Sequence, residues 1–251
     1  MNKELSPEDL IRYERNIKIP FIGKEGQKKL KNASVLIIGV GGLGSASGFY
    51  LASAGIGRIG LVDNDVVELS NLNRQILHAH QRLGMLKVES ARNILRGLNP
   101  ELEVDVYPLL FEQKFAEEIL PKYDVVVDGT DNFETRYLIN KVCVQYNKPY
   151  VYGAVFQFSG QVSVFHANRG PCFQCVFHQM PPQPVIDANR KPGVIGALPG
   201  IIGTIQTVEA IKLFLGIGEP LIGRLLVVDG MEMDFSEIKI EKDSKCPVCK
   251  K

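Results

Sequence analysis

The chain has 251 residues, of which 45% are hydrophobic and 23% charged, and its formal net charge is +1. This near-neutral balance argues against a nucleic-acid partner, which would need a basic surface, and against an acidic tail. The length is enough for one large α/β core. Apolar runs short of a membrane span and a charged first stretch, unlike a signal peptide, lead us to expect a cytoplasmic protein without a membrane partner.

The first predicted helix runs from Ser6 to Ile17. Ser6 is a typical N-cap, and a proline and two acidic residues follow it in the first turn. Arg12 and Arg15 are three residues apart and therefore occupy neighbouring positions on one helix face. For Arg12 we favour a solvated basic face. Residues 21–30 are expected to form a loop and a short helix that lead into the first strand.

The stretch from Ser34 to Gly44 joins a predicted buried strand to a turn of bare backbone and then to a helix that opens at about Gly42. Glycines let amide N–H groups approach a phosphate closely, and a helix N-terminus adds partial positive charge. We interpret this stretch as a nucleotide-binding loop; the alternative is a tight strand-to-helix turn without a ligand. The candidate binding positions are Gly39, Gly41, Gly42 and Gly44.

After a small-residue helix at 43–54, a second predicted strand, 58–63, ends in Asp63. In nucleotide-binding βαβ units a carboxylate about 20 residues beyond the glycine loop binds a ribose hydroxyl. The polar segment that follows lies directly beyond the carboxyl end of this strand, the edge at which doubly wound sheets bind ligands. It carries Asp65, Asn71 and Arg74.

From residue 86 to residue 155, predicted helices and strands alternate. This β-α-β-α order predicts a Rossmann-like, doubly wound and mainly parallel sheet with helices on both faces. The elements are a helix at 86–95, a strand at 102–107, a helix at 112–120, a strand at 123–128, a helix at 133–146 and a strand at 149–155.

Two charged residues in this region stand at helix starts. Lys87 begins the helix at 86–95, where a cation opposes the helix macrodipole, and this weakly favours an anionic partner. Asp131 follows a strand end and precedes the helix at 133–146. Its carboxylate either caps that helix or binds a metal ion, and both interpretations stay open on this residue alone.

The pattern changes after residue 155. Alternating apolar and polar residues around Ser159-Gly160 predict a hairpin over 156–166, and irregular, proline-rich sequence follows. Without a repeat or a low-complexity linker, we expect one domain over 1–251, with a nucleotide-binding core at about 30–155. The later elements are the irregular stretch at 178–199, a largely buried helix at 201–215, and closing antiparallel strands at 224–229 and 235–240.

Four of the five cysteines form two Cys-x-x-Cys pairs. Two such loops supply four thiolates to one tetrahedral ion, and four protein ligands leave no open position, so we predict a structural zinc site. The zinc ligands are Cys172, Cys175, Cys246 and Cys249. Redox pairs and buried free thiols are the alternatives. Cys143 is interpreted as a core residue, and the histidines have no metal-ligand spacing and stay unassigned.

These features together resemble one family, over nearly the whole chain. The glycine loop, Ser70-Asn-Leu-Asn-Arg74, Thr130-Asp-Asn132 and the paired cysteines occur in the same order in the ubiquitin-activating-enzyme-like (HesA/MoeB/ThiF) adenylyltransferases. The branch that the chain resembles most is that of the molybdopterin-synthase and thiazole-biosynthesis adenylyltransferases. Part 156–251 would then carry the hairpin, the zinc site and the carrier-binding surface.

The resemblance implies ATP-dependent adenylation of the C-terminal Gly-Gly tail of a ubiquitin-like sulfur-carrier protein. An anionic carboxylate must approach a triphosphate, so the site needs cations and Mg²⁺ more than a general base. By resemblance, Asp63 binds the ribose and Asp131 holds Mg²⁺, with Asn132 beside it. Asn71, Arg74 and Lys87 would surround the phosphates, and Asp65 and Ser70 would also belong to the nucleotide site. Arg15 would reach the triphosphate from the other subunit of a homodimer.

One departure from the family concerns the loop Asp187–Gly193. Members that form a covalent carrier intermediate have a cysteine there, whereas this chain has Asn189 near that place. We therefore predict adenylation alone, with sulfur from a separate donor. Two other functions are weighed: an NAD-dependent oxidoreductase, for which the cations and Asp131 would be superfluous, and a non-catalytic scaffold.

Overall fold

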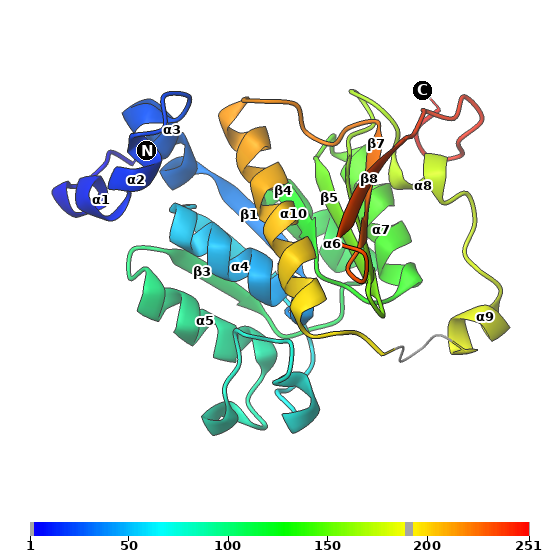
Figure 1. The fold of residues 1–251 in the computed structure, drawn as a ribbon, viewed down its shortest axis with the longest axis horizontal. Coiled ribbons are helices and arrows are strands. Elements are labelled where there is room, and N and C mark those ends of the chain that lie inside the picture. The colour runs from blue at the N-terminus through cyan, green and yellow to red at the C-terminus, as the bar shows by residue number, and fades with distance from the viewer. Residues whose placement is uncertain (1–2, 189–192, 251) are drawn as a thin grey trace.

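The structure, a computed structural model, describes residues 3–188 and 193–250. One eight-stranded sheet runs through it in the order β3-β2-β1-β4-β5-β6-β7-β8 (Figure 1). Strands β1 to β5 are parallel, and β6, β7 and β8 join antiparallel. The predicted fold class is confirmed. The strands are β1 (Ser34–Ile38), β2 (Arg58–Val62), β3 (Glu103–Tyr107), β4 (Val125–Asp128), β5 (Tyr150–Phe156), β6 (Ser159–Phe165), β7 (Arg224–Asp229) and β8 (Asp234–Lys239).

Helices cover both faces of this sheet. Helices α4, α5 and α10 lie on one face, and α6 and α7 lie on the other (Figure 1). The helices are α1 (Pro7–Arg12), α2 (Glu14–Ile17), α3 (Gly23–Asn32), α4 (Gly42–Ala54), α5 (Lys87–Leu98), α6 (Gln113–Ile119), α7 (Phe133–Gln145), α8 (Phe173–Val176), α9 (Gln183–Ala188) and α10 (Ala197–Leu215), with short 3₁₀ turns η1 (Leu69–Asn71), η2 (His80–Arg82) and η3 (Leu120–Lys122).

Strand β1 shows why its sequence is apolar without interruption. Successive side chains of a strand point to opposite faces of the sheet, so a strand covered on both faces needs apolar residues at every position. Val35 and Ile37 belong to the core beneath α4 and α10, and Leu36 and Ile38 belong to the core beneath α6 and α7. All four are at most 2% exposed, and each fully buried side chain of this size stabilises the fold by about 1.5–3 kcal/mol.

Small residues in α4 let α10 approach it closely. A Cβ on Gly203 of α10 would lie 2.6 Å from the carbonyl oxygen of Leu43, so any side chain there would force the helices apart. The hydroxyl of Ser47 donates to the carbonyl oxygen of Gly203 at 3.3 Å, which ties the two helices together. Helix α4 begins at Gly42 and ends at Ala54, where Gly55, with φ +89°, caps it as predicted.

Helix α10 is the central helix of this face. With 19 residues it is long and apolar enough to meet the length and composition of a membrane-spanning helix, a run that the sequence analysis did not expect. Half of its most apolar window is buried inside the protein, and the helix packs against α4, β5 and β6. The part of the chain that the structure describes therefore uses α10 as a core helix.

Three predicted boundaries were wrong. The first helix divides into α1 and α2 at Tyr13, whose backbone angles (φ −102°, ψ 16°) are not helical and whose side chain is buried. The stretch at 178–199 was expected to be irregular, yet it contains α9, and α10 begins at Ala197 and not at 201. The third error concerns the hairpin.

The hairpin between β5 and β6 turns at Gln157 and Phe158, earlier than the predicted Ser159-Gly160. Gln157 adopts the left-handed conformation with φ +52°. Ser159 and Gly160 lie inside β6 and pair with Asp229 and Val228 of β7. Glycine at 160 serves close packing, because a Cβ there would lie 2.4 Å from the side chain of Ile202 in α10.

Candidate nucleotide site and metal centre

The glycine loop connects β1 to α4 and packs against the loop that follows β4. Gly39 has φ +88°, and a Cβ on Gly44 or on Gly129 would lie within 2.1 Å of the Gly39 carbonyl oxygen. Glycine is therefore required at these positions by packing alone. A Cβ on Gly41, in contrast, would meet its nearest atom at 3.7 Å, an ordinary contact distance. Bare backbone at Gly41 leaves space beside the loop that a ligand can use.

Helix α4 starts at this loop with Gly41 as its N-cap, and no side chain caps its first turn. The first N–H groups of a helix have no partner within the helix and carry the positive end of the macrodipole. A Cβ on Gly42 would lie 3.7 Å from Cγ of Arg74, so this arginine stands beside the helix start. Backbone donors and a guanidinium together favour an anionic ligand.

Asp63 lies at the end of β2 and touches the glycine loop directly. Its Oδ2 accepts the N–H of Val40 at 2.8 Å, and its Oδ1 accepts the N–H of Asp65 at 2.9 Å. Each carboxylate oxygen can accept a further hydrogen bond, so the group remains available to a hydroxyl.

Lys87 is a buried cation at the start of α5. Its side chain is 7% exposed, and its Nζ contacts Asp65 Oδ2 at 2.8 Å, while the Asp65 side chain is 62% exposed. The backbone N–H of Lys87 donates to the carbonyl oxygen of Asp65. An ammonium group in this position, at a helix start, is stabilised by one exposed carboxylate and would be stabilised further by an anionic ligand.

The segment between β2 and α5 folds back to place Asn71 and Arg74. Asn71 is 8% exposed, and its Oδ1 accepts the N–H of Glu68 at 3.0 Å. Arg74 donates from Nη1 to the carbonyl oxygen of Ser70 at 3.0 Å and to Asn73 Oδ1 at 2.9 Å. These contacts hold the guanidinium with neutral acceptors, and no carboxylate pairs with it among the described residues.

Asn132, and not Asp131, is the N-cap of α7. The Oδ1 of Asn132 accepts the N–H of Thr135 at 2.9 Å. The capping interpretation of Asp131 was therefore wrong: a cap must precede the helix directly, and Asn132 occupies that position. The Asp131 side chain is exposed, and within residues 3–188 and 193–250 no hydrogen bond or ion pair engages it. Its carboxylate remains free to hold a cation.

A buried polar platform that the sequence analysis missed supports Asp131. Asp128, the last residue of β4, is fully buried and accepts Thr130 Oγ1 at 2.6 Å and the Tyr150 hydroxyl at 2.7 Å. Arg136 Nε lies 3.4 Å from Asp128 Oδ2, and its Nη2 donates to the Thr130 carbonyl oxygen at 2.8 Å. Burial and the Asp128 carboxylate raise the pKa of Tyr150 well above its usual value. The sequence feature that could have indicated this buried network is an aspartate, Asp128, at the end of an otherwise apolar strand.

All but one of the predicted nucleotide-site residues thus gather at the carboxyl ends of β1, β2 and β4. The exception is Arg15. It is exposed on α2, and its neighbour Asn16 donates to Gln27 Oε1 at 3.2 Å and to the Ala54 carbonyl oxygen at 3.5 Å, at the far end of α4. A helix of 13 residues is about 20 Å long, so Arg15 lies far from the glycine loop of its own chain.

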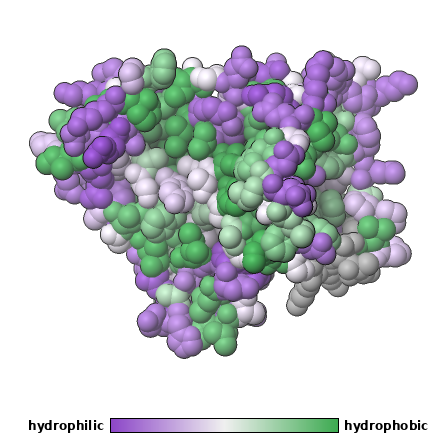
Figure 2. All heavy atoms as spheres, viewed as in Figure 1, coloured by the Kyte–Doolittle hydropathy of each residue, from purple (hydrophilic) through white to green (hydrophobic). Residues whose placement is uncertain are grey.

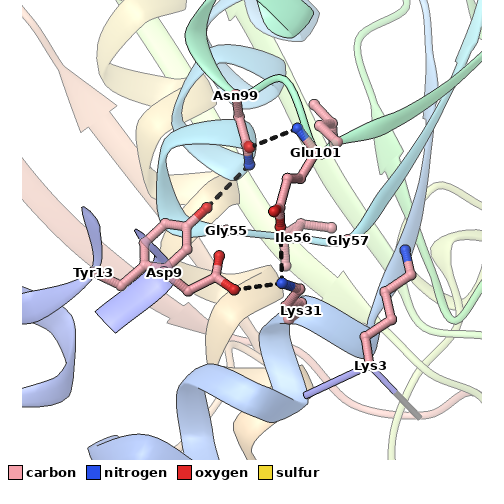
Figure 3. Close-up of a pocket in the computed structure, with 10 residues that line it drawn as sticks. Lys3, Asp9, Tyr13, Lys31, Gly55, Ile56, Gly57, Asn99 and Glu101 are labelled. Atoms are coloured by element: carbon pink, nitrogen blue, oxygen red, sulfur yellow. Dashed lines mark hydrogen bonds and ion pairs between the residues drawn. The ribbon is translucent and has the colours of Figure 1, made fainter. Parts of the chain in front are cut away.

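Helices α1 and α2 form an N-terminal arm, which is held by residues around a small hollow beneath it (Figure 3). Asn99 Nδ2 donates to the Tyr13 hydroxyl at 3.0 Å, and Lys31 pairs with Asp9 and, at 2.8 Å, with Glu101. The hollow has a volume of about 10 Å³, room for one water molecule at most. The contacts around it, among Asp9, Tyr13, Lys31, Asn99 and Glu101, anchor α1 and α2, and we call them the N-terminal clasp. The hollow itself is too small for a ligand.

The four cysteines of the predicted metal centre come together. All four side chains are at most 5% exposed, and their sulfur atoms lie within 4.8 Å of one another. Tetrahedral zinc with Zn–S bonds of about 2.3 Å places its sulfur atoms about 3.8 Å apart. The measured separations fit this geometry: they are 3.6 Å for Cys172–Cys246, 3.8 Å for Cys172–Cys175 and 3.4 Å for Cys175–Cys249.

The cluster can therefore hold a metal ion, and it joins the segment after β6 to the C-terminal tail. Asn140 of α7 supports it: its Nδ2 lies 3.7 Å from Cys172 Sγ, and its Oδ1 accepts the N–H of Phe173 at 2.9 Å. Cys143 is buried apart from the cluster, in the core beneath α7, as predicted. The position of Asn189, noted in the sequence, lies outside the described residues.

Comparison with known proteins gives a consistent result. The ThiF family model matches residues 13–248. A sulfur carrier protein adenylyltransferase of Thermus thermophilus is 44% identical over 247 residues, which cover 96% of this chain and 91% of that protein. The adenylyltransferase and sulfurtransferase MOCS3 of Aedes aegypti is 45% identical over 98% of this chain, but the chain spans only 56% of the length of that relative.

Solved structures of an E. coli protein share the fold. MccB with MccA-N7isoASN has a TM-score of 0.87 at 26% identity, covering 98% of this chain and 76% of that one. MccB with ATP has a TM-score of 0.84 at 27% identity, covering 95% of this chain and 74% of that one.

Proposed function

The chain belongs to the ThiF family, and on this premise we propose that it adenylates the C-terminal glycine carboxylate of a ubiquitin-like sulfur-carrier protein with ATP. The single observation that carries the proposal is the convergence of the glycine loop, Arg74, Lys87 and Asp131 at one edge of the sheet. Support comes from a relative named sulfur carrier protein adenylyltransferase and from one named adenylyltransferase and sulfurtransferase MOCS3.

The reaction joins two anions, and the site's charges answer that difficulty. The carrier carboxylate attacks the α-phosphorus of ATP, the bond to the β-phosphate oxygen breaks, and pyrophosphate leaves with the electron pair. Arg74, Lys87 and the first amides of α4 are placed to offset the negative charge of the phosphates, and preorganised donors of this kind are worth several kcal/mol of barrier each. No general base is required, because the carboxylate is already ionised at neutral pH.

Two carboxylates take different roles in this proposal. Asp63, which already orders the glycine loop through Val40, would accept a hydrogen bond from the ribose. Asp131 is exposed at the same edge and would hold Mg²⁺, an ion that prefers carboxylate oxygen and neutralises phosphate charge when bound. Asn71 and Ser70 would add neutral contacts beside Arg74, and Asp65 would release Lys87 toward the phosphates.

The cysteine cluster would hold Zn²⁺ in a structural role. Four sulfur ligands complete a tetrahedral shell, so no position remains for water or substrate. The ion would pin the C-terminal tail to the segment after β6, and it takes no part in the chemistry.

We also propose a homodimer whose two subunits complete each other's sites. Arg15 cannot reach the glycine loop of its own chain, yet it is exposed on an N-terminal segment that also exposes the apolar residues Ile11 and Phe21, to 80% and 78%. The lobe between β2 and α5 also exposes Leu69 and Ile76, and Figure 2 shows hydrophobic residues on this lobe and over α5 and α10. A twofold axis would bring the N-terminal arm of each chain to the partner's lobe.

We propose molybdopterin or thiazole synthesis as the pathway that receives the sulfur, and a separate protein as the sulfur donor. The chain's segment 187–193 carries no cysteine, and the five cysteines are taken by the cluster and the core. Part 156–251 would bind the carrier.

Exchange of labelled pyrophosphate into ATP tests the proposal. The exchange should require Mg²⁺ and a carrier that ends in Gly-Gly, and it should vanish when the terminal carboxylate is converted to an amide. Comparing carriers from the two pathways identifies the physiological one. Titration calorimetry with ATP·Mg and with NAD distinguishes the adenylyltransferase from an NAD-dependent oxidoreductase. Binding of NAD with no binding of ATP would overturn the proposal.

A further inference from the structure

His78 lies beneath the glycine loop, although its spacing in the sequence indicated no role. The side chain is buried, at 7% exposure. Its Nε2 lies 3.0 Å from the Val40 carbonyl oxygen, and its Nδ1 lies 3.0 Å from Ser90 Oγ. Since Asp63 holds the N–H of the same residue, both peptide groups of Val40 are fixed by side chains.

The partners of the ring determine its tautomer. Burial and the nearby Lys87 lower the pKa of His78, so the imidazole is neutral at pH 7 and has one N–H. A carbonyl oxygen only accepts, so the N–H must be at Nε2 and must donate to Val40. Nδ1 is then the acceptor, and the Ser90 hydroxyl donates to it.

These bonds join three segments that face the phosphates in the proposed function. Val40 belongs to the glycine loop between Gly39 and Gly41. His78 follows Arg74 through a continuous turn, in which the N–H of His78 donates to the Gln75 carbonyl oxygen and the N–H of Gln75 donates to that of Asn71. Ser90 lies three residues after Lys87 on α5, about one helical turn away.

We propose that His78 is a positioning residue for nucleotide binding: its Nε2–H fixes the Val40 peptide, and thereby the glycine loop, relative to Arg74 and Lys87. This inference rests on the proposed function, because it assumes that the loop binds ATP phosphates. His78 itself does not touch the nucleotide. A histidine that only fills the core would depend on its volume, whereas a positioning histidine depends on the hydrogen at one nitrogen.

Two substitutions separate these roles. A glutamine amide nitrogen lies about as far along the side chain as Nε2 of histidine, and an asparagine amide nitrogen about as far as Nδ1. His78→Gln therefore keeps a donor for Val40, and His78→Asn loses it. The exposed His80, two residues along the chain, offers the matched control His80→Asn.

Two measurements on the full-length protein are needed. Amide hydrogen exchange without ligand should show faster exchange of the glycine loop at 39–44 in His78→Asn than in wild type, His78→Gln or His80→Asn. Titration with ATP·Mg should show an affinity about tenfold weaker for His78→Asn, the lower end of the range found for residues that orient the ligands of metal sites, and within about threefold of wild type for His78→Gln. The KM for the carrier should stay unchanged.

The outcomes distinguish the inference from the proposed function. Equal losses in His78→Asn and His78→Gln would show a packing role and overturn the inference while ATP binding by the wild type stands. Wild-type affinity in His78→Asn would overturn it as well. A wild-type protein that binds no ATP·Mg would overturn the proposed function and the inference together. Thermal unfolding of each variant, expected within a few degrees of wild type, shows that the fold is intact.

Discussion

The cysteine cluster and the proposed nucleotide edge both form where distant segments meet, but in the proposed dimer one chain completes only the cluster. The four sulfur atoms are buried and lie within 4.8 Å of one another, ready for an ion without rearrangement. At the proposed nucleotide edge the two cations are engaged with the protein itself, in the pairs Lys87–Asp65 and Arg74–Ser70, whereas the Asp131 carboxylate is exposed. The remaining cation, Arg15, lies at the other end of α4.

This difference separates two kinds of site by physical criteria. A structural centre gains most when its ligands are fixed in advance, because the bound ion then adds its full binding energy to folding. A site for a reacting triphosphate must bind, distort and release its ligand, so its charged groups have internal partners that the ligand can replace. Substitutions at one of these two sites, with the other site measured as a control, therefore test the difference.

The largest effect is expected from Asp131→Ala. Loss of the proposed Mg²⁺ ligand removes charge stabilisation from the transition state, and pyrophosphate exchange should fall about 10³-fold. The metal content of the cysteine cluster and the thermal unfolding temperature should stay at wild-type values, because the Asp131 side chain is exposed and makes no hydrogen bond or ion pair within the described residues.

Glu134→Ala is the matched control for this change. Glu134 is another exposed carboxylate, three residues further along in the first turn of α7. It should leave the exchange rate unchanged. If Asp131→Ala retained wild-type exchange, the assignment of the Mg²⁺ ligand would be wrong, and the exposed carboxylate would be an ordinary surface group.

The second-largest effect is expected at the proposed nucleotide site, which needs Arg15 of the partner subunit. Arg15→Ala and Arg74→Ala should each lower exchange about 10²-fold, and a mixture of the two, unfolded and refolded together, should recover about a quarter of the wild-type activity. Random pairing makes about half of the dimers mixed, and each mixed dimer has one intact site of two. Arg12→Ala, which removes a neighbouring arginine that pairs with Glu8, should retain activity. A mixture that stays inactive would contradict a shared site.

The third effect is expected at the cysteine cluster. Cys175→Ser should release the metal ion and lower the thermal unfolding temperature by about 10 °C, the size expected for the loss of a structural ligand. Binding of ATP·Mg should persist, because the cluster is remote from the glycine loop in the sheet. Cys143→Ala, a change in a buried cysteine outside the cluster, should retain the metal. The test is metal analysis by mass spectrometry together with a thermal melt.

The fold could be predicted from the sequence because its signals are local. The apolar run of β1, the small residues of α4 and the glycine at 55 each determine an element without reference to distant residues. The hairpin turn was misplaced because Gly160 resembles a turn glycine, whereas its role is to accommodate Ile202 of α10. Such a role depends on tertiary packing, which one sequence does not display.

The same distinction between local patterns and tertiary packing separates the site residues that the sequence analysis named from those that it missed. Glycines, carboxylates and cysteine pairs with known spacing were identified from their order in the chain. Asp128 and Arg136 were missed, because their importance lies in a buried network that joins β4, α7 and β5. His78 was missed for the same reason: a lone histidine has no pattern, and only the structure brings it to Val40.

The smallest effect is expected at the N-terminal clasp, which connects the two sides of the comparison. It holds the arm that carries Arg15, and like the cysteine cluster it is complete within one chain. Burial alone would raise the pKa of Asp9, but hydrogen bonds from Lys31 and Ser6 outweigh it, and the net pKa is lowered. A lowered folded-state pKa contributes stability that is present above the ordinary carboxyl range, near pH 4, and is lost as pH falls further.

Asp9→Asn should therefore reduce the free energy of unfolding by on the order of 1 kcal/mol at pH 7, and the difference from wild type should close toward pH 3. Chemical denaturation at both pH values measures it. At pH 7 the variant should also show weaker pyrophosphate exchange, because a looser arm presents Arg15 to the partner less often, while the metal content stays unchanged. A variant that loses stability at pH 7 but exchanges at the full rate would show that the clasp stabilises the chain without positioning Arg15.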